Sequence, residues 1–123
     1  MHEYRFSQIN RLLEAKQYKR VFAEPVRQTN RFFTILARRN LIALPRLGLA
    51  ISKKNIRLAK DRNRIKRIIR ESFRHEKSGF ANLDLVVMAK QDALKADNTE
   101  LFNSLSALWL NLSHIFSIEN KSE

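Results

Sequence analysis

The apolar residues of this chain repeat at helical spacing in three segments. The segment EAKQYKRVF predicts a short helix over residues 14–22, which Pro25 ends. A second helix is predicted over residues 61–74, DRNRIKRIIRESFR, because its apolar residues fall within one sector at about 100° per residue. The members of that sector are Ile65, Ile68, Ile69 and Phe73. The last helix is predicted to begin at Asp97 or Thr99 and to pack a row of Leu, Phe and Trp residues against a core.

Four other segments have the composition of β-strands. Residues 30–39 are rich in aromatic and β-branched side chains, and residues 26–29 form a weaker candidate because Pro25 precedes them. Residues 46–52 alternate large and small side chains, so the small face has room for a packed helix or a ligand. Residues 83–90 are apolar on both faces, which is typical of an interior strand.

The order of these elements predicts a single α+β domain, an α-β-β-β-α-β-α sandwich. A chain of 123 residues has room for one modest core, and two Gly and two Pro leave no linker. We therefore expect residues 1–123 to form one domain. Its ordered core is predicted over about residues 7–116, with a flexible C-terminal tail over residues 117–123.

Positive charge is concentrated in one part of the chain. Lys and Arg number 24 against 12 Asp and Glu, which gives a formal net charge of +12. Twelve of the cations but only three of the anions lie between Arg46 and Lys77, a local surplus of nine. A surplus of this density favours a binding surface for a polyanion, although a basic protein kept soluble by its charge is the simpler alternative.

The remaining residue types argue against a metal site or a catalytic centre in the protein. The chain has no Cys, and its three His residues share no ligand spacing, so we expect no bound metal. A protein nuclease needs clustered carboxylates or a His pair. The acidic residues of the basic region and its surroundings are instead scattered among cations, and each is expected to pair with a neighbouring Arg or Lys. They are Asp61, Glu71, Glu76 and Asp84.

No segment has the pattern of a membrane protein. The first 17 residues lack the continuous apolar run of a secretory signal, and no later run reaches the length of a membrane span. We therefore expect a cytoplasmic protein that does not bind a membrane.

Nucleic acid is the polyanion that this pattern fits best. Cations on one face of the helix over residues 61–74 can neutralise several phosphates together. No helix and turn precede that helix, because RLGLAISKK is predicted as a strand, so a helix-turn-helix unit is disfavoured and RNA is favoured over DNA. Tyr18, Phe22 and Phe33 have the aromatic rings to stack on unpaired bases. Aromatic residues at this spacing are more often part of a core, and both interpretations stand.

The segment ISKKNIRLAKDRNRIKRIIRESFR resembles the signature region of the protein subunit of bacterial ribonuclease P. That signature is an Arg-Asn-Arg segment at the start of a basic helix, here Arg62, Asn63 and Arg64. The resemblance continues in QYKRVF, RFFTILARRN, PRLGLAISKKN, DLVVMAK and LWLNL, so it covers roughly residues 12–112. The chain is most similar to proteobacterial members.

The resemblance implies a function. In that family a large RNA subunit is the catalyst, and its bound Mg²⁺ ions promote hydrolysis of one phosphodiester, which removes the 5′ leader of precursor tRNA. The protein, a monomer present once per RNA, binds both the catalytic RNA and the leader, and no protein residue is catalytic. It also lowers the magnesium requirement.

The resemblance also assigns residues and a fold. Contacts to ribonuclease P RNA are implied for Arg62, Asn63, Arg64, Lys66, Arg67 and Arg70, with Lys53 and Lys54 continuing that surface. The leader is expected in a cleft between the short helix and the sheet, against Tyr18, Phe22 and Phe33. The fold is expected to be like the second domain of ribosomal protein S5, with a left-handed β-α-β crossover.

Two alternatives remain beside this interpretation. A ribosomal or RNA-chaperone protein would use the same basic helix on ribosomal RNA, and an autonomous nuclease would need an active site that the sequence does not indicate. The chain also departs from the family at Leu36, where some members have a Tyr in the leader cleft.

Overall fold

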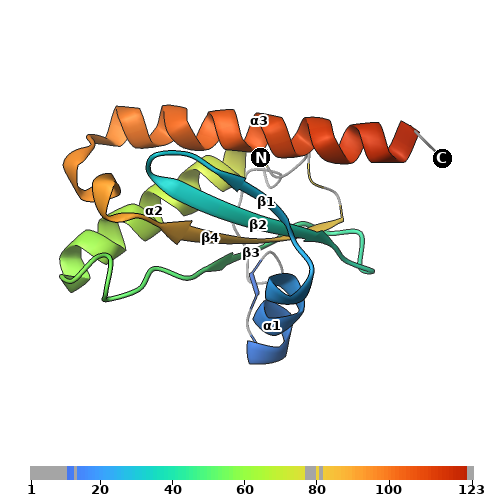
Figure 1. Cartoon of the computed structure of the whole chain (residues 1–123), viewed down its shortest axis with the longest axis horizontal. Helices are drawn as coiled ribbons and strands as arrows, with labels where there is room; N and C mark the ends of the chain where they lie inside the picture. The colour runs from blue at the N-terminus through green and yellow to red at the C-terminus, as the bar shows by residue number, and fades with distance from the viewer. Residues whose placement is uncertain (1–10, 13, 77–79, 81, 122–123) are drawn as a thin grey trace.

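The computed structural model describes residues 11–12, 14–76, 80 and 82–121, and its elements follow the predicted order (Figure 1). They are α1 (Ala15–Ala23), β1 (Val26–Thr29), β2 (Phe33–Arg39), β3 (Arg46–Leu49), α2 (Ala59–Glu76), β4 (Leu83–Ala89), the short 3₁₀ helix η4 (Gln91–Lys95) and α3 (Asn98–Lys121). The α+β fold class and the α-β-β-β-α-β-α order are therefore confirmed, with η4 as an addition.

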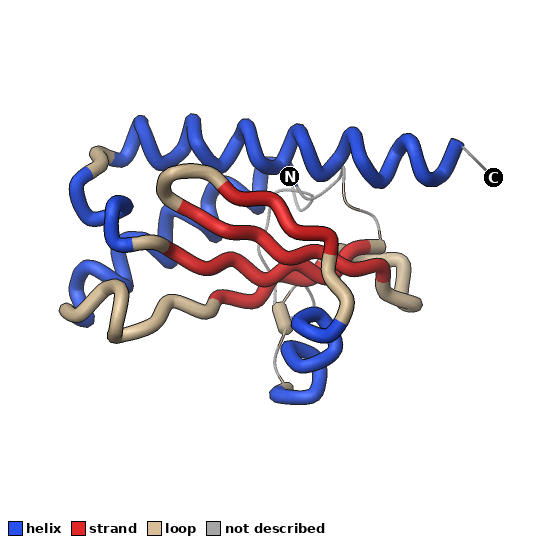
Figure 2. The backbone as a smooth tube through the Cα atoms, viewed as in Figure 1, coloured by secondary structure: helices blue, strands red, loops and turns tan. Residues whose placement is uncertain are grey.

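The four strands form one mixed sheet in the order β1-β2-β4-β3 (Figure 2). β2 pairs antiparallel with both β1 and β4, whereas β3 pairs parallel with β4. Parallel neighbours need a crossover connection, and α2 provides it between β3 and β4. β4 is thus an interior strand, as its apolar composition predicted. The handedness of the crossover and the S5-like label stay predictions.

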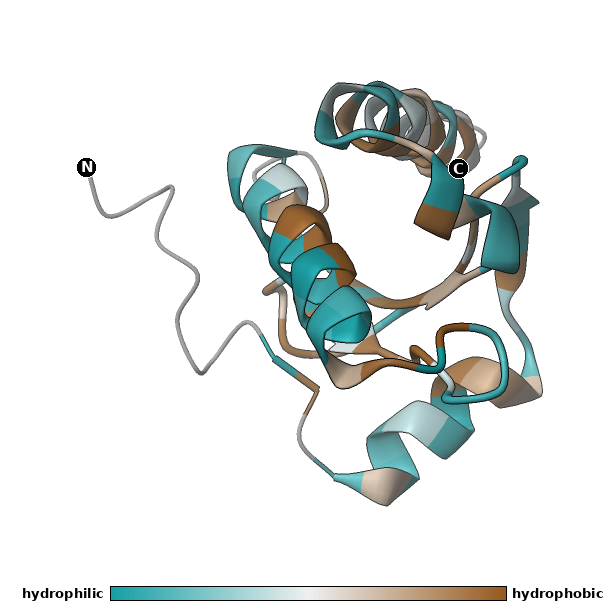
Figure 3. Ribbon diagram, turned by 90° about the vertical axis from the view of Figure 1, so that its left-hand side faces the viewer, coloured by the Kyte–Doolittle hydropathy of each residue, from teal (hydrophilic) through white to brown (hydrophobic). Residues whose placement is uncertain are grey.

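Helices cover both faces of the sheet. α2 and α3 lie on one face and α1 lies on the other (Figure 3). The larger core fills the α2 and α3 side, where Phe73, Phe80 and Trp109 form an aromatic cluster with ring centroids 5.7 to 6.3 Å apart. The Trp109 Nε1–H donates to Ser72 Oγ at 2.7 Å, which satisfies the one polar group that this ring buries. α2 and α3 are therefore held together by a well-defined core.

A smaller core lies between α1 and the opposite face of the sheet. Its buried members are Leu12, Val21, Leu36 and Val86, with Tyr18, Ala50 and Met88 partly buried beside them. The strand residues alternate between the two cores because successive side chains point to opposite faces. Arg11 and Leu12 extend the sheet beyond β3, since the Leu12 N–H donates to the Leu47 carbonyl at 3.0 Å.

Several predicted boundaries differ from the structure, most clearly the start of β2 and the end of α3. β2 begins at Phe33 and not at Asn30, because the Asn30 Oδ1 accepts hydrogen bonds from the backbone N–H groups of Phe32 and Phe33 and forms a turn. α3 continues to Lys121, so the tail predicted over residues 117–123 is helical through Lys121. The predicted start of the ordered core, residue 7, lies outside the described residues.

Candidate nucleic-acid interface

α2 presents its cations to solvent because its apolar sector faces the core. Ile65, Ile68, Ile69 and Phe73 are at most 5% exposed, as the helical spacing predicted. Asn63 and Arg67 are exposed on the outer side of the helix, and Lys66 and Arg70 are half-buried at its flank. Lys53 and Lys54 are exposed in the loop that leads from β3 to α2. We call Asn63, Lys66, Arg67 and Arg70, together with Lys53 and Lys54, the basic face of α2.

The two arginines of the Arg-Asn-Arg segment also hold neighbouring loops in place. Arg62 Nη1 donates to the carbonyls of Ile56 and Arg57 at 3.0 and 2.7 Å, which fixes the loop before α2. Arg64 Nε donates to Asn98 Oδ1 at 3.1 Å, and its Nη2 donates to the Ala96 carbonyl at 2.6 Å. A guanidinium has five N–H donors, so each of these two side chains can donate to an anion in addition to the carbonyl and amide oxygens that it already binds. The segment therefore has a structural role, and its contact with RNA stays a prediction.

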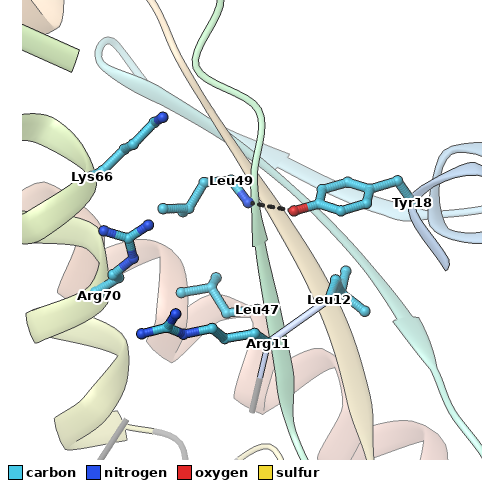
Figure 4. Close-up of a pocket in the computed structure, with 7 residues that line it drawn as sticks. All are labelled: Arg11, Leu12, Tyr18, Leu47, Leu49, Lys66 and Arg70. Carbon is cyan, nitrogen blue, oxygen red and sulfur yellow. Dashed lines mark hydrogen bonds between the residues drawn. The ribbon is translucent and has the colours of Figure 1, made fainter. Parts of the chain in front are cut away.

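A depression of about 140 Å³ lies between α2 and the α1 side of the sheet (Figure 4). Three cations from two separate parts of the chain lie there, Arg11 from the edge segment and Lys66 and Arg70 from α2. Its other lining residues are Leu12, Tyr18, Leu47 and Leu49. Burial, and after it the positive charge of Arg11, lower the pKa of Arg70. Among the described lining residues three are cations and none is a carboxylate, a composition that favours an anion in this depression.

Tyr18 forms the wall of this depression on the α1 side. Its hydroxyl oxygen accepts a hydrogen bond from the Leu49 N–H at 3.3 Å. Its ring lies so close to Gly48 that a Cβ atom at that position would be 2.6 Å from the Tyr18 Cε1 atom. The small face predicted for this strand thus receives a side chain of α1, and Tyr18 remains partly exposed.

The aromatic residues predicted to contact a leader do not lie together. Phe22 is 45% exposed on α1, on the same side of the sheet as Tyr18. Phe33 is fully buried in the core between the sheet and α2 and α3, so its placement in a cleft beside α1 is wrong. The strand position that does face α1 is Leu36, which is 5% exposed. The aromatic part of the site therefore consists of Tyr18 and Phe22.

Arg11 is the residue that sequence reasoning missed. It lies outside every predicted element, and its place beside Arg70 results from backbone pairing of its segment with β3. Arg11 belongs to no periodic pattern, and the nearest signal was its neighbour Leu12, an apolar residue before the first predicted helix.

The buried carboxylate near the start of β4 has a structural role. Asp84 is fully buried and accepts hydrogen bonds from Arg46 Nε and Nη2, both at 2.8 Å, and from Asn40 Nδ2 at 2.9 Å. Arg20 of α1 lies 3.8 Å from the same carboxylate and donates to the Arg39 carbonyl, which ties α1 to the sheet. The prediction that Asp84 pairs with arginine is confirmed. Among the described residues, no three His, Cys, Asp or Glu side chains lie close enough to hold a metal ion.

The sequence is similar to proteins of a known family. A sequence profile described as Ribonuclease P matches residues 6–113. The chain is 47% identical over 113 residues to the ribonuclease P protein component of Vibrio cholerae, an alignment that covers 92% of this chain and 96% of that protein. It is 42% identical over 113 residues to that of Pseudoalteromonas translucida, covering 92% and 81%.

Solved structures match in the same way. The Staphylococcus aureus RNase P protein superposes with a TM-score of 0.76 at 32% identity, covering 85% of this chain and 94% of that one. The RNase P protein from Thermotoga maritima superposes with a TM-score of 0.72 at 28% identity, covering 80% and 94%. Within the described ranges, no helix is long and apolar enough to cross a membrane.

Proposed function

The chain belongs to the ribonuclease P protein family, and we propose that it binds the RNA subunit of that enzyme together with the 5′ leader of precursor tRNA. The observation that supports this most is the continuity of the basic face of α2 with the cationic depression beside Tyr18. One surface can then contact two RNA segments. Family membership favours this function over a ribosomal or RNA-chaperone role.

The proposed division of the surface follows exposure. Arg67 and Asn63 on the outside of α2, with Lys53 and Lys54 before it, contact the catalytic RNA. Tyr18 and Phe22 contact unpaired leader bases. Lys66, Arg70 and Arg11 lie between these two areas, where they neutralise phosphates of whichever strand passes through the depression.

The protein acts on the reaction through charge. Catalytic RNA and precursor tRNA repel each other, and a protein with a net charge of +12 between them lowers that repulsion. The chemistry, hydrolysis of one phosphodiester with Mg²⁺ bound by RNA, belongs to the RNA subunit, and no protein side chain takes part in bond breaking. A monomeric protein, one copy per RNA and a cytoplasmic location remain predictions.

A binding comparison tests this proposal. The protein is titrated with the ribonuclease P RNA of its own genome and, as a control, with a ribosomal RNA fragment of the same length at the same salt. Preferential binding of the ribonuclease P RNA, weakened in Lys66→Ala and Arg70→Ala variants, is the expected result. Equal binding of both RNAs would contradict it.

A further inference from the structure

The opposite flank of α2 carries a second depression, with different chemistry. It lies between α2 and α3 and has a volume of about 400 Å³. α2 lines it with one helical stripe, Arg64, Arg67, Ile68 and Glu71, and α3 lines it with Asn98 and Phe102, one turn apart. We call this depression the α2–α3 groove. It is separate from the cationic depression, since the two depressions share no lining residue within the described part of the chain.

The α2–α3 groove is only partly charged. Ile68 and Phe102 form an apolar patch inside it, and Phe102 is partly buried, so its ring packs on the core and is still accessible. Glu71 is held by Arg74 and His75, and the hydrogen bond from Arg74 is the main cause that lowers the pKa of its carboxyl. Glu71 is therefore ionised at neutral pH. A carboxylate in the lining opposes a phosphate inside the groove, in contrast to the cationic depression.

Hydrogen-bonding groups line the groove beside the apolar patch. Asn98 uses its Oδ1 to accept from Arg64, which leaves its amide N–H groups as donors, while the Glu71 carboxylate is an acceptor. Arg64 is held by this hydrogen bond and by its hydrogen bond to the Ala96 carbonyl, so it links α2 to the start of α3 at one side of the groove. Arg67 is exposed at the rim. A nucleotide matches this lining. Its base would find the ring of Phe102 and the polar groups of Asn98 and Glu71, and its phosphate would find the exposed cation of Arg67.

We propose that the α2–α3 groove receives an unpaired nucleobase of the RNA bound by α2, stacked on Phe102, while Arg67 contacts the phosphate of the same nucleotide. The proposal rests on the proposed function, because the base belongs to an RNA that α2 must first bind. Unpaired bases that splay onto aromatic side chains and hydrogen-bond through their edges are the usual basis of sequence-specific RNA recognition. The groove thus adds base recognition to a surface that otherwise contacts phosphates.

The test replaces the ring and keeps the packing. Phe102→Leu retains an apolar side chain against the core, and Phe102→Tyr retains the ring. Leu110→Ala on the same helix, at a residue that is 71% exposed and outside the groove, is the matched control. Affinity for the ribonuclease P RNA of the same genome is measured at several salt concentrations, and thermal unfolding is measured for each variant.

We expect Phe102→Leu to weaken RNA binding about tenfold without changing the slope of log affinity against log salt, since stacking releases no counterions. Phe102→Tyr and Leu110→Ala should bind like the original chain. Arg67→Ala should lower the slope by about one. Probing of base edges with dimethyl sulfate should show an unpaired adenine or cytosine that the original chain protects and Phe102→Leu exposes.

Three results would overturn the proposal. Full affinity of Phe102→Leu would mean that no base lies on the ring. A changed salt slope in Phe102→Leu would mean that the substitution lowers affinity by displacing cations. A loss of affinity that only follows a loss of thermal stability would mean that the substitution acts on the fold. If the original chain shows no preference for ribonuclease P RNA, the proposed function itself is wrong. That result is distinct from the three above, which leave RNA binding intact and contradict only the base in the groove.

Discussion

The ring of Tyr18 on α1 occupies the space that a side chain at position 48 on β3 would need. A Cβ atom there would be 2.6 Å from Tyr18 Cε1 and 2.9 Å from its hydroxyl oxygen. Gly48 thus allows α1 to place an aromatic wall next to the cationic depression. The absence of a side chain on the strand determines where the site's aromatic residue can lie.

Gly48→Ala is expected to push the Tyr18 ring away and to break its hydrogen bond with the Leu49 N–H. The free energy of unfolding should fall by about 1 kcal/mol, the usual value for one such bond, and leader affinity should fall with it. Urea denaturation of the single variants and of Gly48→Ala combined with Tyr18→Ala measures the coupling. Strictly additive losses would show that the two residues do not compete for this space.

Ala43→Gly is expected to stabilise the protein. Ala43 has φ of 61°, a left-handed conformation that costs a residue with a Cβ atom about 1–2 kcal/mol. Glycine avoids this cost, but its more flexible unfolded state offsets part of the stabilisation. A net gain of about 0.5–1 kcal/mol in urea denaturation should result. Ala107→Gly in the middle of α3 is the control, with an expected loss of about 1 kcal/mol. Destabilisation by both substitutions would argue against the left-handed conformation.

Arg64→Ala and Arg67→Ala should behave differently although both remove a cation from α2. Arg64 holds Ala96 and Asn98, so its loss should lower the free energy of unfolding by about 1–3 kcal/mol as well as RNA affinity. Arg67 is exposed, so its loss should lower RNA affinity alone. Thermal unfolding beside RNA titration separates the two effects. Equal stability of both variants would remove the structural role assigned to Arg64.

Phe73→Ala should be among the most destabilising substitutions in the chain. The side chain is fully buried between Phe80 and Trp109, and truncation of such a ring costs about 3 kcal/mol or more. Leu110→Ala, at an exposed position of α3, should change the free energy of unfolding by less than about 0.5 kcal/mol. A small loss for Phe73→Ala in urea denaturation would mean that the α2 face has been wrongly assigned.

The elements were predictable where one side of a segment is apolar. α2 was predicted from Ile65, Ile68, Ile69 and Phe73 because a helix packed by one face must repeat its apolar residues, and its cations then had to point outward. β4 was predicted because an interior strand is buried on both faces. These patterns depend on local spacing, which the sequence contains.

The errors concern relations between distant segments. A strand pattern separates two faces, but it does not say which helix covers each face, and so Phe33 was placed beside α1 although it packs under α2 and α3. The hydrogen bonds of Arg62 and Arg64 to backbone carbonyls were not predicted, because those carbonyls lie in loops with no pattern of their own. Arg11 reaches the site through backbone pairing, which leaves no side-chain periodicity.

The most direct test of the central claim is cleavage of a precursor tRNA at low magnesium by the ribonuclease P RNA of the same genome. The reaction is run with RNA alone, with protein alone and with both. Cleavage at the mature 5′ end only when both are present is the predicted result. Equal cleavage by RNA with and without the protein would contradict the proposed function, and cleavage by the protein alone would contradict the assignment of the chemistry to RNA.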